Sequence, residues 1–457
     1  MEVCMNIIIA GGGKVGATLA RQLSAEKHDI TLIDSSRKVL GASMEKLDIF
    51  AVHGNCASMS VLLQAGVKDA DLLIAVTNAD EVNLLCCTTA HGINPSLHTI
   101  ARIRTPEYLD QIYEMRDVFG LSMAINPEKQ AAVEIERLLK YPGFLRRDSF
   151  AKGRAEIVEL RIEKGSKLQD VALMDMPNIV KTKVLVCAVL RDGKALVSNR
   201  GSFVLREGDR IFVTAPTENL TRMLKNLDII TRKARRAILC GGGKVGYYLA
   251  DMLCKDGIAV QLIESNYDRC VELATLLPEA SIVHGDATVQ SLLDNEGLAA
   301  CDALVTMTGM DELNMVVSLY GTSRNIPQVI TKLGHAENRN ILSSLPIGSI
   351  VCPKELCCSQ ITRYVRAMQN QAGAAISVHT IADGQAEAVE FLVDSTVKNC
   401  GVPLKDLKLK SGLLIAGITH GARSEVPNGG SMFQPGDSVV VVTSGQDPLL
   451  QLNDIFA

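Results

Sequence analysis

Gly11-Gly12-Gly13-Lys14-Val15-Gly16 returns, letter for letter, as Gly241-Gly242-Gly243-Lys244-Val245-Gly246. Each copy follows an apolar run, at 6–10 or 237–240, and each precedes a helix-like stretch. A strand, a glycine turn and a helix are the context in which G-x-G-x-x-G indicates a dinucleotide-binding loop. There the first glycine makes the tight turn, the second admits a pyrophosphate and the last lets helix and strand pack closely. The N–H groups that open the helix would then hold the phosphates.

An acidic residue ends the second apolar strand of each copy. Asp34 follows Gly11 by 23 positions, and Glu264 follows Gly241 by the same number. A carboxylate near this place meets the ribose hydroxyls of a dinucleotide. Because it would repel a 2′-phosphate, we expect NAD(H) to be favoured over NADP(H).

Length and composition narrow the class of protein. A chain of 457 residues is too long for one core, and its length predicts about three domains. The net charge of −4 and the lack of a basic block give no case for nucleic acid. No apolar stretch is long enough to span a bilayer, and the first strand begins so early that we expect no signal peptide.

The cysteines favour reduced thiols. There are 13, an odd number, with no C-x-x-C spacing, which argues against a disulfide framework or a zinc site. The vicinal pairs Cys86-Cys87 and Cys357-Cys358 fall in helical patterns, where buried packing is favoured over a redox role.

The repeat extends well beyond the loops. His53-Gly54-Asn55 matches His284-Gly285-Asp286, and the stretch 70–77 matches 301–308. We therefore predict an α/β chain with two doubly wound Rossmann-like parallel-sheet domains, each followed by a small β-rich α+β domain. The predicted order is a first nucleotide domain at 1–125, a crossover helix at 126–147, a small domain at 148–231, a second nucleotide domain at 232–350, a crossover helix at 351–371 and a second small domain at 372–457. Pro127 and Pro353 suit the first turns of the two crossover helices.

At this point the chain resembles the RCK family, whose KTN and TrkA-C modules regulate potassium transport. The residues that carry the resemblance are Gly11 to Gly16 with Asp34, the run 75–83, Ala101-Arg102 and the turn Glu207-Gly208-Asp209. The resemblance implies that the end of the fourth strand lies beside the dinucleotide, which adds Thr77, Asn78 and Arg102 to the first site. Thr308 and Lys332 take the matching places in the second site, where Gly309 replaces Asn78. These departures leave the ligand of the second site open.

The resemblance also implies partners and a place in the cell. We expect a cytoplasmic subunit, peripheral on the inner face of the cell membrane. It would assemble into a homo-oligomeric gating ring, a tetramer, and act on a TrkH- or TrkG-like potassium-translocating subunit. It would not be an enzyme.

Two pairs of polar residues leave their roles open. A lysine at a helix N-terminus, such as Lys14 or Lys244, opposes the helix dipole by about 0.3–1 kcal/mol unless a phosphate lies beside it. Because a lysine also suits the extra charge of ATP or ADP, these nucleotides compete with NAD(H) for each site, and exposure to water is the alternative. Asn55 and Asp286 are candidates for contact with adenine.

Other polar residues have simpler interpretations. For Asp80-Glu81 and Asp311-Glu312 we favour helix capping and an acidic first turn over a metal site. For His53 and His284 we favour a structural role before a tight turn. The small domains contain no H-E-x-x-H, no G-x-S-x-G and no P-loop, so we expect them to bind partners.

The leading hypothesis is a nucleotide-sensing regulator of potassium uptake. One rival is an NAD-dependent dehydrogenase, which would need a proton-transferring group beside the nicotinamide. The other is a regulator of a different cation channel or antiporter, which the same modules could serve.

Overall fold

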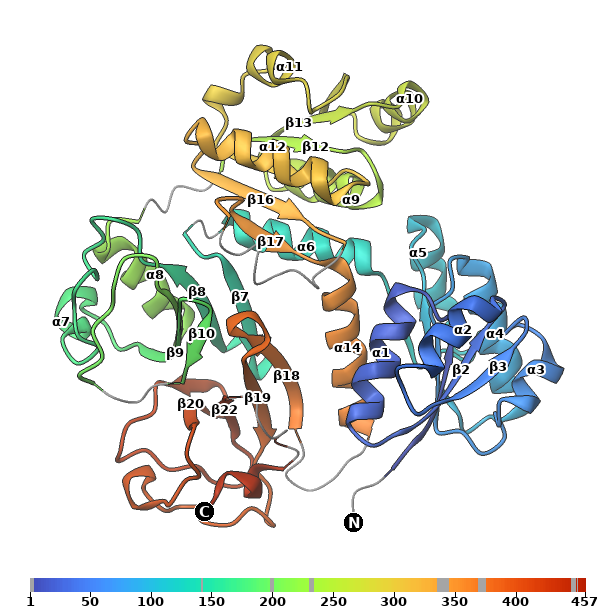
Figure 1. Ribbon diagram of the computed structural model, residues 1–457, viewed down its shortest axis with the longest axis horizontal. Helices are drawn as coiled ribbons and strands as arrows, with labels where there is room; N and C mark the ends of the chain where they lie inside the picture. Colours follow the sequence, from blue (N-terminus) through green and yellow to red (C-terminus); the bar gives the residue numbers. More distant parts are fainter. Residues whose placement is uncertain are drawn as a thin grey trace. The chain divides into compact units, whose positions relative to one another are not determined.

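The computed structural model describes residues 4–140, 143–197, 201–229, 234–334, 345–368, 375–444, 449 and 451–457 (Figure 1). The chain divides into two compact units. One contains Met1–Ala132 with Cys352–Thr362, and the other contains Val133–Val351 with Arg363–Ala457. These boundaries fall inside helices α6 (Pro127–Lys140) and α14 (Pro353–Met368), so each of these helices contributes to both units.

The first unit is built on a six-stranded parallel sheet with the strand order β3-β2-β1-β4-β5-β6. Its strands are β1 (Asn6–Ala10), β2 (Asp29–Asp34), β3 (Phe50–His53), β4 (Leu72–Ala75), β5 (His98–Arg102) and β6 (Met123–Ile125). Its helices are α1 (Lys14–Ala25), α2 (Arg37–Met44), α3 (Met59–Gln64), α4 (Asp80–Ile93) and α5 (Pro106–Met115). All four residues of β4 are buried, as expected where helices cover both faces of a parallel sheet. The strand order reverses at β1, because β2 and β3 are added on one side of it and β4 to β6 on the other. The carboxyl ends of β1 and β4 therefore border the crevice where such sheets bind ligands.

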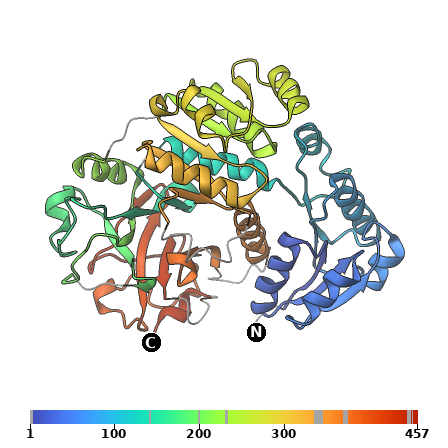
Figure 2. The same cartoon turned by 45° about the horizontal axis from the view of Figure 1, so that its top comes forward.

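The second unit contains a sheet of the same topology, ordered β14-β13-β12-β15-β16-β17. Its strands and helices are coloured yellow-green to orange in Figure 2. Its strands are β12 (Arg236–Cys240), β13 (Ala259–Glu264), β14 (Ser281–His284), β15 (Ala303–Thr306), β16 (Gln328–Lys332) and β17 (Ser349–Val351). Its helices are α9 (Lys244–Lys255), α10 (Tyr267–Leu276), α11 (Gln290–Asn295) and α12 (Asp311–Ser323), with the short turn η2 (Leu298–Ala300).

The same unit holds two small antiparallel sheets of five strands each. The first has the order β10-β9-β11-β8-β7, from β7 (Arg146–Phe150), β8 (Ala155–Arg161), β9 (Leu185–Arg191), β10 (Lys194–Leu196) and β11 (Arg210–Ala215), with η1 (Ala151–Gly153), α7 (Met176–Val180) and α8 (Thr217–Asn226). The second has the order β18-β19-β22-β20-β21, from β18 (Ala375–Ile381), β19 (Ala386–Leu392), β20 (Leu413–His420), β21 (Arg423–Glu425) and β22 (Ser438–Thr443), with η3 (Ala382–Gly384), η4 (Leu404–Asp406) and η5 (Leu452–Ile455).

The predicted fold class is confirmed, because two parallel sheets alternate with two small antiparallel ones. The crossover segments predicted at 126–147 and 351–371 contain α6 and α14, which begin at the expected prolines. Helix α6 ends at Lys140, however, and β7 already starts at Arg146, before the predicted small domain. In the described part of the chain, no helix is both long and apolar enough to cross a membrane.

Within the second unit, α6 packs against the second parallel sheet although it follows the first sheet in sequence. The side-chain amide of Gln328 on β16 donates to the carbonyl oxygen of Leu138 at 2.6 Å. Lys140 forms an ion pair of 2.9 Å with Asp256, the residue that ends α9. Part of the first crossover helix is thus fixed to the second nucleotide domain.

Candidate nucleotide-binding sites

Two glycines of each loop are required by the fold itself. Gly11 has a φ of +103°, in the left-handed region that favours glycine. A Cβ atom on Gly16 would lie 1.8 Å from the carbonyl oxygen of Gly11, so no side chain fits between α1 and β1. Gly241, with a φ of +113°, and Gly246, whose Cβ would lie 2.2 Å from the Gly241 oxygen, repeat both features.

The glycine between them has no such internal reason. Gly13 and Gly243 have ordinary φ values of −66° and −63°, and a Cβ atom on either would meet nothing within 4 Å. Both are exposed, and each stands at the N-terminus of a helix that lacks a side-chain cap. The space beside these residues therefore fits the close approach of a phosphate to backbone N–H groups.

The two acids are held against their loops by backbone hydrogen bonds. Asp34 accepts from the N–H groups of Gly12 and Ser36, both at 2.7 Å. Glu264 accepts from Gly242 at 2.7 Å and from Asn266 at 2.8 Å. Because a carboxylate has about four lone-pair positions, each half-buried acid retains capacity to accept from a ribose hydroxyl.

A buried asparagine organises the carboxyl end of β4. Asn83 accepts from the backbone N–H and the hydroxyl of Thr77, at 2.8 and 2.7 Å, and donates to the carbonyl oxygen of Arg102 at 2.8 Å. The guanidinium of Arg102 donates back to the Thr77 carbonyl oxygen at 2.6 Å and to the side chain of Asn78 at 3.2 Å. The structure thus brings Thr77, Asn78 and Arg102 together, as predicted.

The second domain repeats this arrangement with different side chains. Asn314 accepts from the N–H and hydroxyl of Thr308, both at 2.8 Å, and donates to the Lys332 carbonyl oxygen at 3.0 Å. The Lys332 ammonium donates to the carbonyl oxygens of Thr308, at 2.7 Å, and Met307, at 3.2 Å. Asn83 and Asn314 were not predicted as site residues, although their shared place in the repeated Asp-Glu-x-Asn is the signal that would have identified them.

Arg102 is a buried cation at the first site. Burial lowers the pKa of its guanidinium, and the like charge of Arg104 acts in the same direction, whereas Glu128 and Cys357 oppose the shift. Its Nε atom is buried without a hydrogen-bond partner among the described residues. An anionic ligand nearby would supply a negative charge opposite this buried guanidinium.

The prediction that Asp80 caps helix α4 is wrong. Ala79 occupies the cap position, and Asp80 instead accepts from the N–H groups of Arg104 and Thr105, both at 2.9 Å. Burial acts to raise the pKa of this carboxyl, but these hydrogen bonds outweigh it and the pKa is lowered. Asp311 likewise accepts from the N–H of Gly334 at 2.8 Å. Each acid ties its helix to the segment after the neighbouring strand, while the predicted acidic first turns are present.

The remaining polar candidates lie in the loops after β3 and β14. Asn55 accepts from the N–H of Ala57 at 3.0 Å, and Asp286 accepts from the N–H and hydroxyl of Thr288, both at 2.8 Å. These bonds lower the pKa of Asp286. They shape the loops, and contact with adenine stays a prediction.

The structure also places the two histidines and the two lysines of the repeat. The ring Nε2 atoms of His53 and His284 lie 3.1 Å from the carbonyl oxygens of Ser35 and Ser265, which agrees with a structural role. Lys14 and Lys244 are exposed first residues of α1 and α9. Over the described ranges, no three acidic, histidine or cysteine side chains gather in a way that could hold a metal ion.

Helix α14 reaches the first nucleotide loop from the other end of the chain. Within the first unit, the thiol of Cys358 lies 3.9 Å from the carbonyl oxygen of Val15. Cys357 and Cys358 are buried, as are Cys86 and Cys87, so the predicted packing role is confirmed. Burial raises the pKa of Cys358 to about 12.

Comparison with known proteins supports this description domain by domain. The TrkA-N domain family matches residues 7–127 and 237–353, and the TrkA-C domain family matches residues 157–228 and 388–457. The Trk system potassium uptake protein TrkA of Halomonas elongata is 30% identical over 99% of this chain and 98% of its own length. The TrkA homolog of Archaeoglobus fulgidus is 31% identical over 99% of this chain and 100% of its own length.

Solved structures share the fold. The GsuK channel bound to NAD has a TM-score of 0.60 at 15% identity and covers 97% of this chain and 77% of its own. GsuK bound to ADP has a TM-score of 0.50 at 13% identity, covering 80% and 70%. Tandem domain matches in the same order, together with full-length relatives, show that the chain belongs to the TrkA family of Trk system potassium uptake proteins.

Proposed function

We propose that this chain is a cytoplasmic nucleotide-sensing regulatory subunit of a potassium uptake transporter. It binds NAD(H) at its two loops and gates a TrkH- or TrkG-like membrane subunit from a tetrameric ring at the inner face of the membrane. The names of its relatives support the transport role. The observation that carries nucleotide binding is that Gly13 and Gly243 leave open space at the N-termini of helices that have no side-chain cap.

The first site has the chemistry expected for a dinucleotide. The loop N–H groups receive the pyrophosphate, Lys14 adds a positive charge beside it, and Asp34 accepts from the adenosine ribose. Because Asp34 is an acid, a 2′-phosphate is disfavoured and NAD(H) is the preferred ligand. The remaining part of the ligand extends toward Thr77, Asn78 and Arg102.

The second site differs where the far end of the ligand would lie. Lys332 takes the place of Arg102, and Gly309 removes the side chain that Asn78 supplies. A compact ammonium and an open backbone suit a terminal phosphate, so ATP and ADP compete with NAD(H) most strongly here. The solved structures of GsuK include one bound to NAD and one bound to ADP, which makes these two ligands the natural pair to test.

Ligand binding has a route into the rest of the chain. Cys357 on α14 lies close enough to Arg102 to affect the pKa of its guanidinium, so a phosphate or nicotinamide near Arg102 binds beside that helix. Helix α14 belongs to the first unit up to Thr362 and to the second from Arg363 onward. A shift at one site therefore acts on the second unit through a continuous helix. The shift occurs only if the ligand has different affinities for the two states.

A thermal-melt titration with NAD⁺, NADH, NADP⁺, ATP and ADP tests this proposal. A ligand at a hundred times its Kd stabilises the folded state by about 2.7 kcal/mol. We expect NAD(H) to raise the melting temperature, and Gly13→Asp and Gly243→Asp each to remove part of the rise. Gly92→Asp is the matched control, because Gly92 also has open space and ordinary φ but lies at the far end of α4. If no nucleotide shifts the melt, the loops have no ligand role and the proposal fails.

A further inference from the structure

The two small domains pack face to face through equivalent surfaces. In the first, Phe150 pairs with Ala155 across the η1 turn, and in the second, Ile381 pairs with Ala386 across η3. All four residues lie in one apolar cluster that joins the two sheets. The shared register makes position 148 equivalent to 379 and position 152 equivalent to 383.

Polar contacts at the rim repeat in both directions. Arg154, which follows η1, donates to the carbonyl oxygen of Gly421 in the β20–β21 turn. Gln385, at the equivalent place after η3, donates to the carbonyl oxygen of Gly193 in the β9–β10 turn at 2.6 Å. The two domains are therefore related by an approximate two-fold rotation.

The charged residues at this interface break that symmetry. Asp148 and His379 occupy equivalent positions, yet they meet as unlike groups, with 3.0 Å between Asp148 Oδ1 and His379 Nδ1. Two identical domains would place the same residue on both sides. A hydrogen-bonded pair of different residues forms only between a first and a second domain.

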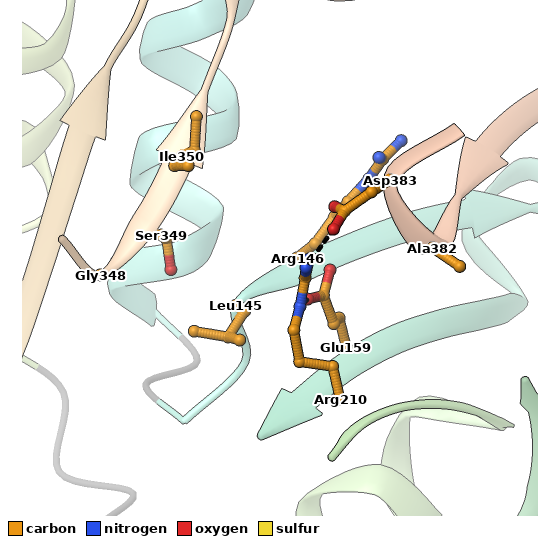
Figure 3. Close-up of a pocket in the computed structure, with 9 residues that line it drawn as sticks. All are labelled: Leu145, Arg146, Glu159, Arg210, Gly348, Ser349, Ile350, Ala382 and Asp383. Carbon is orange, nitrogen blue, oxygen red and sulfur yellow. Dashed lines mark hydrogen bonds and ion pairs between the residues drawn. The ribbon is translucent and has the colours of Figure 1, made fainter. Parts of the chain in front are cut away.

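A second asymmetric contact lies beside the first. Arg210 bonds Glu159 of its own domain and reaches across to Asp383 of the second small domain at 2.6 Å (Figure 3). Arg210 pairs with Arg161 on β8, and Ser438 pairs with Leu392 at the matching place on β19, so Arg210 and Ser438 are equivalent. The position equivalent to Asp383 is 152, which is a lysine. The side chains of Arg210, Glu159 and Asp383 are only 13%, 5% and 5% exposed. The cavity that they line with β17 is about 40 Å³, too small for a nucleotide.

Because these charged side chains are buried, the stability of the interface depends strongly on the partners that they find across it. Burial alone would lower the pKa of Arg210, but Glu159 and Asp383 outweigh it and the pKa is raised. A buried charge that loses its partner, or faces a like charge, strongly destabilises an interface. Between two first domains, Arg210 would lose Asp383, because position 152 carries a lysine, and Asp148 would meet another Asp148 with only Arg146 of its own domain as an ion-pair partner. Between two second domains, Asp383 would face Ser438 and have no cation from across the interface.

We infer that Asp148, Arg210, His379 and Asp383 specify pairing of the first small domain with the second, and reject pairing of like with like. The two halves of the chain differ at equivalent positions, so the unlike pair places Asp148 opposite His379 and Arg210 opposite Asp383, which neither like pair does. The occupant of each domain's interface is therefore the other small domain of the same type of chain.

The test is hydrogen–deuterium exchange on the full chain, followed at β7 and β18. Asp383→Lys places a lysine opposite Arg210, which reproduces the contact between two first domains. We expect exchange in both strands to rise at least tenfold. Adding Arg210→Ser, the residue of the second domain, removes one of the two cations of this cavity, so the new lysine can pair with Glu159 while Arg146 remains. Part of the protection should then return.

Two further variants keep the test decisive. Asp228→Lys makes the same charge change in the exposed Lys167–Asp228 pair of the first small domain and should leave both strands within twofold of wild type. If Asp383→Lys does not fold, Asp383→Asn should give a smaller rise that Arg210→Ser again reduces. Unchanged exchange in the Asp383 variants, or no recovery with Arg210→Ser, would overturn the inference. Neither result depends on nucleotide binding.

Discussion

The two candidate nucleotide sites share their scaffold and differ in the residues that would face a ligand. Both keep the glycine loop, and both use a buried asparagine, Asn83 or Asn314, to fix the end of the fourth strand. The residues that differ are Asp34 and Glu264, Asn78 and Gly309, and Arg102 and Lys332. The repeat has therefore preserved the residues that hold the backbone and changed those that, in our proposal, would contact the ligand.

The largest expected effect tests the shared scaffold. Asn83→Ala and Asn314→Ala each leave the N–H of a threonine and the carbonyl oxygen of a strand end without their partners. We expect each to lower the free energy of unfolding by about 3 kcal/mol, measured by urea denaturation. Asn219→Ala, which removes one side-chain bond to the Lys183 carbonyl oxygen, should cost about 1 kcal/mol or less. If one of the two buried-asparagine variants lost less than half as much unfolding free energy as the other, the two scaffolds would not be equivalent.

The next effect concerns the ribose-facing acids. Asp34→Asn is measured in a Gly243→Asp chain, and Glu264→Gln in a Gly13→Asp chain, so that one site is read at a time. Loss of a hydrogen bond to a charged group, about 1.5–3 kcal/mol, should weaken NADH binding by about tenfold or more at each site. Isothermal titration calorimetry measures this. A loss at the first site alone would assign a different nucleotide to the second.

Exchanging the cations sharpens the comparison further. Arg102→Lys replaces the guanidinium, whose Nη2 donates to both the Thr77 carbonyl oxygen and the Asn78 side chain, with a shorter side chain that ends in a compact ammonium. With one hydrogen bond lost, we expect NADH affinity at the first site to fall about threefold to tenfold. Lys332→Arg should raise the ratio of NADH to ADP affinity at the second site. If the ratio of NADH to ADP affinity is unchanged in both variants, these cations do not select the ligand.

The smallest effect is a pH dependence at Asp80. Because its folded-state pKa is lowered, its contribution to stability is present above the unfolded value, about 3.9, and is lost as pH falls through the folded value. We therefore expect the stability difference between wild type and Asp80→Asn to be largest near neutral pH and to shrink below about pH 4. Melting temperatures measured from pH 7 to pH 3 check this. A difference that grows on acidification would reverse the assigned sign.

Much of the fold follows from local sequence. The repeated loop with its flanking apolar runs predicts two parallel sheets, and the equal spacing of Asp34 and Glu264 places both acids against their loops. The glycine pattern also predicts the tight turn at Gly11 and the close packing of helix and strand at Gly16. The helices at Pro127 and Pro353 begin where proline predicts them.

What the sequence did not predict depends on contacts between distant segments. From its position in the sequence Asp80 is a candidate helix cap, but its carboxylate accepts hydrogen bonds from the loop after β5, which is distant in the sequence. Asn83 gains its role only because β4 and β5 end side by side. The contact between Asp148 and His379 forms only because two domains pack together, and no spacing in the sequence predicts it.

The most direct test of the account is the stoichiometry of NADH binding to the full chain by calorimetry. The account predicts two equivalents per chain for wild type, one for Gly13→Asp, one for Gly243→Asp and none for the double variant. Gly92→Asp should keep both equivalents. Full binding by the double variant would contradict the claim that the repeated glycine loops hold the nucleotide.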